Sequence, residues 1–167
     1  SDTHNNYVEI EPNVDLILHA GDAFHAGKAL IQNEHQWFSS VRAQFIRWRS
    51  IAPVVYIPGN HDMLLEESSQ WMAEEFAELN VYLLNHQPLL FQGIKIFGTP
   101  FQKIFFNWAF NLNDEDRAKK FAQIEPCDIL ISHSPCYGIL DKAEPYHITE
   151  ATDAQGYAHP GDPILLE

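Results

Sequence analysis

A small set of polar residues has the side-chain types of a metal site. The candidate ligands are Asp2, His4, Asp22, Asn60 and His133. They offer carboxylate oxygens, imidazole nitrogens and an amide oxygen, with no thiolate among them. Such mixed oxygen and nitrogen donors suit Mn, Fe, Zn or Mg better than a structural zinc site built from cysteines.

The spacing of these residues favours a site with two metal ions. Asp2 and His4 are two positions apart, so both side chains can face the same side of an extended strand end. One carboxylate can bridge two cations about 3.5–4 Å apart, as two-metal hydrolases require. Such a pair would polarise a phosphoryl group, generate a hydroxide and stabilise the leaving oxygen.

Each short match also has a purely structural interpretation. An Asp-x-His pair can be accidental, Gly21-Asp22 can be ordinary turn chemistry, and His133 can be a hydrogen-bonded loop histidine. The segment Gly59-Asn60-His61-Asp62 is more informative, because a specified tetrapeptide rarely arises by chance. Its glycine permits a close turn, its asparagine is a neutral oxygen ligand, and its histidine can donate a proton.

The elements that must position these residues alternate between strands and helices. Apolar runs and helical spacing predict strands at Val14–His19, Val54–Ile57, Val81–Leu84 and Asp128–Ser132, a hairpin at Leu89–Phe91 and Ile94–Phe97, and helices at Glu34–Ile51, Ser68–Leu79 and Asp114–Ile124, the last capped by Asn113. This order predicts an α/β domain, followed mostly by loop over 134–167. In open α/β sheets, sites collect beyond the carboxyl ends of strands. Asp22, Asn60 and His133 each follow a predicted strand.

Composition and charge exclude several other classes. The 167 residues contain 23 Asp and Glu against 10 Lys and Arg, a net charge of -13. So acidic a surface disfavours broad electrostatic binding of nucleic acid. No apolar run is long enough to span a membrane. The two cysteines, Cys127 and Cys136, cannot form a disulfide framework, which points to a reducing, cytoplasmic compartment.

Five ordered segments resemble the signatures of the calcineurin-like metallophosphoesterases. They are Ser1-Asp2-Thr3-His4, His19-Ala20-Gly21-Asp22, Pro58-Gly59-Asn60-His61-Asp62, Phe97-Gly98-Thr99-Pro100 and Ser132-His133-Ser134-Pro135. Two further segments are similar to one small branch of the family, the metallophosphoesterase domain-containing proteins. They are Phe97–Leu112 and Tyr137–Asp141. Known members of that branch include cyclic-nucleotide phosphodiesterases.

The resemblance implies a four-layer α/β/β/α sandwich around two divalent metal ions. By motif, Asp2 and His4 would hold one ion, Asp22 would bridge both, and Asn60 and His133 would hold the other. The metal would be Mn, Fe, Zn or Mg.

The resemblance also gives His61 the catalytic role, beside Asn60 at the scissile phosphate. His61 would protonate the leaving group or stabilise its charge. Many phosphatases of the family carry a further Asp three positions after the Gly-Asp pair, but here that position is His25. Asp62 is one candidate for the residue that orients His61.

The chain also departs from the family pattern at its end. The family closes its site with Gly-His-x-His, and neither His147 nor His159 matches that motif. We therefore expect 1–167 to be a single, partial metallophosphoesterase domain that lacks a first strand and the Gly-His-x-His segment. On its own it should be a weak or inactive enzyme.

Two functions from different classes follow. The first is hydrolysis of a phosphate mono- or diester by metal-activated hydroxide at a dinuclear site. Its partner would be a small phosphate ester, with nucleotides among the candidates, and the oligomeric state stays open. The alternative is an inactive interaction scaffold with the same fold, and a C-terminal His-x-His would separate the two.

The aromatic stretch Phe101–Phe110 could line the substrate pocket or pack in the core of an adjacent sheet.

Overall fold

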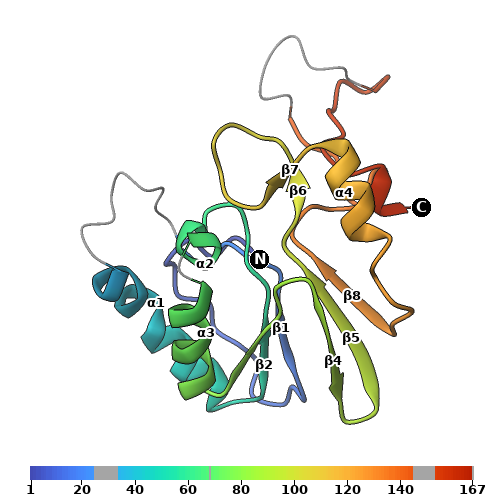
Figure 1. The fold of residues 1–167 in the computed structure, drawn as a ribbon. Helices are drawn as coiled ribbons and strands as arrows, with labels where there is room; N and C mark the ends of the chain where they lie inside the picture. Colours follow the sequence, from blue (N-terminus) through green and yellow to red (C-terminus); the bar gives the residue numbers. More distant parts are fainter. Residues whose placement is uncertain (25–33, 68, 145–152, 167) are drawn as a thin grey trace.

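The computed structural model describes residues 1–24, 34–67, 69–144 and 153–166, arranged around two three-stranded sheets (Figure 1). The first sheet is parallel, with the order β1 (Ile17–His19), β2 (Val54–Tyr56) and β3 (Val81–Leu83). The second has the order β4 (Gln87–Phe91), β5 (Ile94–Thr99) and β8 (Ile129–Ser132). A short parallel pair, β6 (Gln102–Lys103) and β7 (Asn111–Leu112), lies between β5 and β8 in the chain.

The α-helices occupy connections between parallel strands, and a 3₁₀ turn follows the last strand. They are α1 (Glu34–Arg49), α2 (Met63–Glu67), α3 (Ser69–Glu78), α4 (Asp114–Phe121) and a final 3₁₀ turn, η2 (Ile164–Leu166). Parallel strands require long crossovers, which α1 supplies between β1 and β2, and α2 with α3 between β2 and β3. The predicted alternation of strands and helices is confirmed.

The core between α1, α3 and the first sheet is largely aromatic. Phe45 and Trp48 of α1, Phe76 of α3 and Tyr56 of β2 are all buried. The Tyr56 and Phe76 rings are stacked, and Phe45 contacts both of them edge-on. All three residues of β2 are buried because helices cover one face of the sheet and the second sheet covers the other.

A second apolar core fills the space between the two sheets. Val55, Ile57 and Leu84 from the first sheet side pack with Ile96 and Ile131 from the second. The layers therefore run from helices to the first sheet and on to the second (Figure 1). The outermost helix, α4, contacts β6, β7 and η2.

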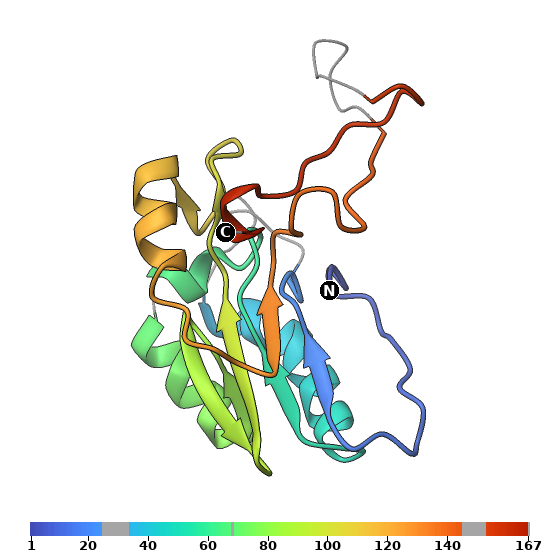
Figure 2. The same cartoon turned by 90° about the vertical axis from the view of Figure 1, so that its right-hand side faces the viewer.

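The strands that precede the candidate site residues all end on the same side. Strands β1 and β2 are parallel, as are β5 and β8, and Figure 2 shows the arrowheads of β1 and β8 pointing to the same end of the molecule. Loops that follow β1, β2 and β8 therefore meet there, as the sequence predicted.

Several local predictions are confirmed and others need correction. Asn113 caps α4, since its Oδ1 accepts a hydrogen bond of 2.9 Å from the Asp116 N–H. The hairpin turns at Gln92 and Gly93, which both have positive φ, as this type of tight turn requires. The strand predicted from Val14 begins only at Ile17. Elements α2, β6 and β7 were not predicted.

The region after β8 has little regular structure, as expected, but it is tied to the domain. Arg117 of α4 and Asp162 form a fully buried ion pair, which fixes the segment leading into η2. Among the described residues, no helix combines the length and apolar character needed to cross a membrane. His25 and His147 lie outside the described residues.

Candidate metal centre

The loops after β1 and β2 approach each other so closely that both need glycine. A Cβ atom on Gly21 would lie 2.7 Å from the Cα of Gly59 and 2.7 Å from Nδ1 of His133. Gly21 also has a φ of +92°, which favours glycine. A Cβ atom on Gly59 would collide with the carboxylate of Asp22. These contacts bring Asp22, Asn60 and His133 to one place.

The segment carrying Asp2 and His4 runs along the loop after β1. The N–H groups of Asp2 and His4 donate to the carbonyls of Gly21 and Asp22, at 2.9 and 3.0 Å. The expected extended strand end is wrong, because Asp2 and His4 both adopt positive φ, at 57° and 45°. The turned backbone still places both side chains beside Asp22.

Asp22 lies at the centre of the site. His4 Nε2 and His61 Nε2 lie 3.8 and 4.0 Å from its Oδ2, and His133 Nε2 lies 3.7 Å from its Oδ1. Ligand atoms of His4, Asp22 and His61 form one group with mutual distances within 4.8 Å, and those of Asp2, Asp22 and His133 form a second. Asp22 is the residue common to both groups.

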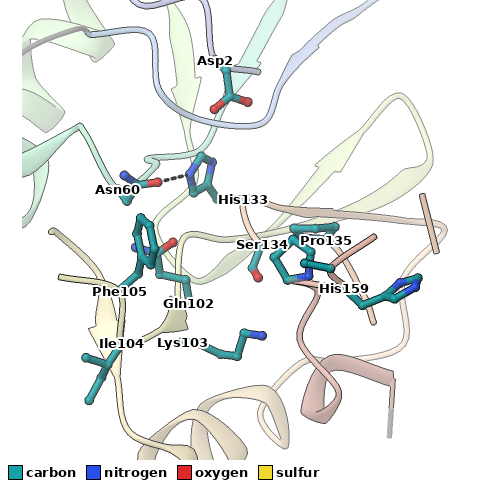
Figure 3. A pocket seen from close by; sticks show the side chains of 12 residues that line it. Asp2, Asn60, Gln102, Lys103, Ile104, Phe105, His133, Ser134, Pro135 and His159 are labelled. Carbon is teal, nitrogen blue, oxygen red and sulfur yellow. Dashed lines mark hydrogen bonds between the residues drawn. The ribbon is translucent and has the colours of Figure 1, made fainter. Parts of the chain in front are cut away.

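Two imidazoles are oriented so that Nε2 faces the site. The Nδ1–H of His4 donates to the carbonyl of Phe24 at 3.0 Å, and that of His133 donates to the carbonyl of Ala20 at 2.8 Å. Such backbone bonds fix the tautomer of metal-binding histidines. The Nε2 lone pair of His133 then faces Asn60 Oδ1 at 2.8 Å (Figure 3). A cation bound by both atoms, in place of this contact, would satisfy both lone pairs, so the donor set fits a divalent metal ion.

A buried carboxyl group, Asp62, holds the backbone around Asp22. Its Oδ2 accepts hydrogen bonds from the Asp22 N–H at 2.9 Å, the Gly59 N–H at 2.5 Å and the Tyr56 hydroxyl at 2.6 Å. Its Oδ1 faces the N–H of Phe24 at 3.4 Å. The carboxylate of Asp62 therefore supports the loops, and these hydrogen bonds do not include the imidazole of His61.

The charge distribution favours a cation at this place. Burial raises the pKa of Asp22 above the usual carboxyl range, and the neighbouring negative charge of Asp2 adds to this shift. Burial and the charge of Asp22 also raise the pKa of Asp62. Two buried carboxyl groups, Asp22 and Asp62, thus lie close together with the exposed Asp2 beside them, and a bound cation would offset their mutual repulsion.

His61 lies between the ligand groups and the aromatic stretch 101–110. Its ring centroid is 4.7 Å from that of His4 and 4.2 Å from that of Trp108. The N–H of Ala109 donates to the carbonyl of Asn60 at 3.1 Å, which fixes the aromatic stretch to the loop after β2. Trp108 is a neighbour of the site that the sequence did not identify.

The aromatic stretch divides between the core and a cavity wall, and that substrate occupies the cavity stays a prediction. Ala109 and Phe110 are buried in the helical core. Ile104 and Phe105 instead line a cavity of about 730 Å³ that borders the metal-ligand groups. Figure 3 shows this cavity with Asn60, His133 and Asp2 at one side.

A further supporting contact joins the Asp-Thr-His segment to β1. Thr3 Oγ1 lies 3.2 Å from His19 Nε2, and both residues are buried. Burial lowers the pKa of His19 to about 3, so this imidazole is neutral. His19 precedes the Gly-Asp pair in the sequence, but neither its position nor its type indicated that it contacts Thr3.

The chain is similar in sequence to several known proteins. The chain is 26% identical to metallophosphoesterase domain-containing protein 1 of Homo sapiens and of Mus musculus, over 84% of this chain and 48% of each relative. It thus spans about half the length of these curated relatives. It is also 28% identical to a probable rhamnogalacturonate lyase C of Emericella nidulans, over 84% of this chain and 14% of that protein.

The family assignment rests on a match over almost the whole chain. The family model for calcineurin-like phosphoesterases matches residues 2–160, which contain all six candidate site residues. The resemblance found in the sequence motifs is therefore confirmed. The chain belongs to the calcineurin-like phosphoesterases, hydrolases that act on phosphate esters and typically bind divalent metals.

Proposed function

We propose that this chain carries a dinuclear metal site that hydrolyses a phosphate mono- or diester. The observation that supports this most is the position of Asp22, which belongs to both groups of candidate ligand atoms. A carboxylate shared in this way can bridge two ions. We also propose that the chain forms part of a four-layer α/β/β/α sandwich.

In this proposal the ligands are divided as the family motifs suggest. Asp2 and His4 would hold one ion, Asn60 and His133 the other, and Asp22 both. The ligand groups of the structure differ in one respect, because Asp2 is grouped with His133 and His4 with His61. Two bound divalent ions would supply an activated water and charge stabilisation on the phosphoryl oxygens. The ions would be Mn, Fe, Zn or Mg.

His61 has two roles open to it in this site. Its Nε2 lies 4.0 Å from Asp22 Oδ2, within the ligand group that includes His4, so it could complete a metal shell. It also follows Asn60, which lines the neighbouring cavity, so it could protonate the leaving oxygen or stabilise its charge. We propose the second role, with Asn60 beside it at the phosphate.

The substrate of this proposed enzyme is a small phosphate ester, with nucleotides among the candidates. The net charge of -13 disfavours long nucleic acids, because a nuclease surface is usually basic. We propose no membrane partner. The two free cysteines, Cys127 and Cys136, are the ground for proposing a cytoplasmic location.

The inactive scaffold is the less favoured function. A scaffold has no need to gather carboxylate, imidazole and amide donors around one buried carboxyl group. It also has no need to fix the Nε2 atoms of His4 and His133 toward that group through backbone hydrogen bonds.

Metal titration tests the proposal directly. Calorimetry with Mn²⁺ should detect binding to the wild-type chain and at least tenfold weaker binding to Asp22→Asn, since one lost carboxylate affects both ions. The matched control is Asp128→Asn, which changes an exposed carboxyl group on the other side of the domain. This variant should bind Mn²⁺ as tightly as wild type. Hydrolysis of bis(p-nitrophenyl) phosphate should depend on added metal. Equal Mn²⁺ affinity in all three proteins would remove Asp22 from the site and favour the scaffold.

A further inference from the structure

The cavity beside the metal-ligand groups has walls of two different kinds. Asp2, Asn60 and His133 form the part next to the proposed ions. The remaining wall is formed by the 102–105 segment on one side and by two loops near positions 134 and 159 on the other (Figure 3). A volume of about 730 Å³ is typical of sites that enclose a small organic molecule.

Most of the wall away from the ligands is apolar. Its apolar members are Ile104, Phe105, Pro135, Ala158 and Pro160. The Phe105 ring packs edge-on against Phe106, with a centroid distance of 4.6 Å, and still exposes 47% of its surface. An exposed aromatic ring that lines the same cavity as two prolines is suited to contact a flat apolar group.

Among the described residues that line this cavity, Lys103 is the only Lys or Arg. Its Nζ donates to the carbonyl of Gly161 at 3.0 Å, which anchors the ammonium group and leaves two of its three N–H bonds for other acceptors. Other cations nearby already have carboxylate partners: Arg117 pairs with Asp162, and Lys142 with Asp153. Lys103 has no such carboxylate partner within the described part of the chain.

An unpaired cation matters in so acidic a protein. The net charge of -13, with Asp2 in the same cavity, opposes the entry of any further negative charge. A ligand that carries a second anionic group would be disfavoured here unless that group reached Lys103. Apart from the proposed ions and from His159, which is paired with Asp141 and Asp153, Lys103 is the cation of this wall that could favour such ligands.

We propose that this cavity is the leaving-group subsite, and that it accepts aromatic leaving groups that carry a second anionic group bound by Lys103. The inference rests on the proposed phosphoesterase function. Hydrolysis adds water across the phosphorus–oxygen bond, so phosphate leaves on one side and the aromatic alcohol on the other. The apolar wall contacts the ring, and Lys103 selects for its anionic substituent.

Binding of stable phosphonates tests the subsite without requiring hydrolysis. The probes are phenylphosphonate and its meta- and para-carboxy derivatives, titrated by calorimetry in the presence of Mn²⁺. We expect the wild-type chain to bind at least one carboxy derivative about tenfold more tightly than phenylphosphonate, from one charge-assisted hydrogen bond. Lys103→Met should abolish or reverse this preference, and Lys103→Arg should retain it. Lys95→Met removes a lysine from the far end of β5 and should bind as wild type.

Each outcome decides between the subsite and the hydrolytic function. A carboxy derivative that binds no more tightly than phenylphosphonate, or a preference that persists in Lys103→Met, would overturn the subsite alone. The expected preference in a protein whose Mn²⁺ affinity is unchanged by Asp22→Asn would support the subsite and overturn the phosphoesterase. If no phosphonate bound, both would be overturned. Phe105→Ala should weaken phenylphosphonate several-fold more than methylphosphonate, and equal losses would contradict the aromatic wall.

Discussion

Replacing Asp62 with Ala would remove the acceptor on which three buried donors depend. These donors are the N–H groups of Asp22 and Gly59 and the hydroxyl of Tyr56, at 2.9, 2.5 and 2.6 Å from Asp62 Oδ2. Asp62 and Tyr56 have no exposed surface, so water cannot easily replace the lost bonds. The variant should therefore be strongly destabilised.

The size of the effect follows from the cost of unsatisfied buried groups. Each donor left without an acceptor costs about 1–3 kcal/mol, so three of them cost roughly 3–9 kcal/mol. Part of this is offset, because removing a carboxyl group whose pKa is raised by burial also removes its desolvation cost. A net loss of about 3–5 kcal/mol in the free energy of unfolding is expected, a large share of a typical domain's 5–15 kcal/mol.

Urea unfolding and thermal melting of wild type, Asp62→Asn and two alanine variants measure this loss. Asp62→Asn keeps one acceptor oxygen and should lose only about 1–2 kcal/mol. Asp128→Ala is the control, because Asp128 also accepts a backbone N–H, from Lys95 at 2.7 Å, but at an exposed position. It should cost less than about 1 kcal/mol. If Asp62→Ala were no more destabilising than Asp128→Ala, Asp62 would not be the support for the site loops described above.

Three further predictions concern the site and its surroundings. His61→Ala should keep its metal content and lose about 10²–10⁴-fold in rate on an alkyl phosphate ester. It should lose far less on a p-nitrophenyl ester, because p-nitrophenolate departs without a proton. Equal rate losses on both esters, with metal content measured by elemental analysis, would remove the acid role of His61. Trp108→Leu should show the same dependence on the leaving group more weakly, because it removes the indole whose ring centroid lies 4.2 Å from that of His61 and leaves the candidate ligands in place. If the ratio of the rates on the alkyl and p-nitrophenyl esters were unchanged, this prediction would be wrong. The hydrogen bond to Asp141 raises the pKa of His159 above its usual value. The stability that the protonated His159 adds to the fold is therefore complete below about pH 6.5 and is lost as the pH rises through the raised pKa. The melting temperature of wild type should exceed that of His159→Gln by more at about pH 6 than at about pH 9, and a constant difference would contradict this prediction.

The sequence predicted best the features that depend on local pattern. The apolar run 54–57 stops at Pro58-Gly59, so strand β2 and the loop carrying Asn60 and His61 were both placed correctly. The helices also followed from the spacing of apolar residues and from the Asn113 cap. These signals lie within a few residues of one another, where the chain's own geometry decides the outcome.

The features that escaped prediction depend on contacts between distant positions. Asp62 was read as a candidate partner of His61, yet its carboxylate bonds to the backbone of Asp22, forty positions away. Trp108 reaches His61 only because β6 and β7, two residues each, turn the aromatic stretch toward the site. Strands this short have no recognisable alternation of polar and apolar residues.

The hydrogen bond from His133 to Ala20 has a consequence for the order of folding. It joins residues 113 positions apart, so the centre cannot be complete until the second sheet has docked on the first. Closing so long a loop is entropically costly and belongs to the late stages of folding. Metal ions that bind only the finished centre should therefore leave the refolding rate nearly unchanged and slow unfolding instead, so that they lengthen the lifetime of the native state.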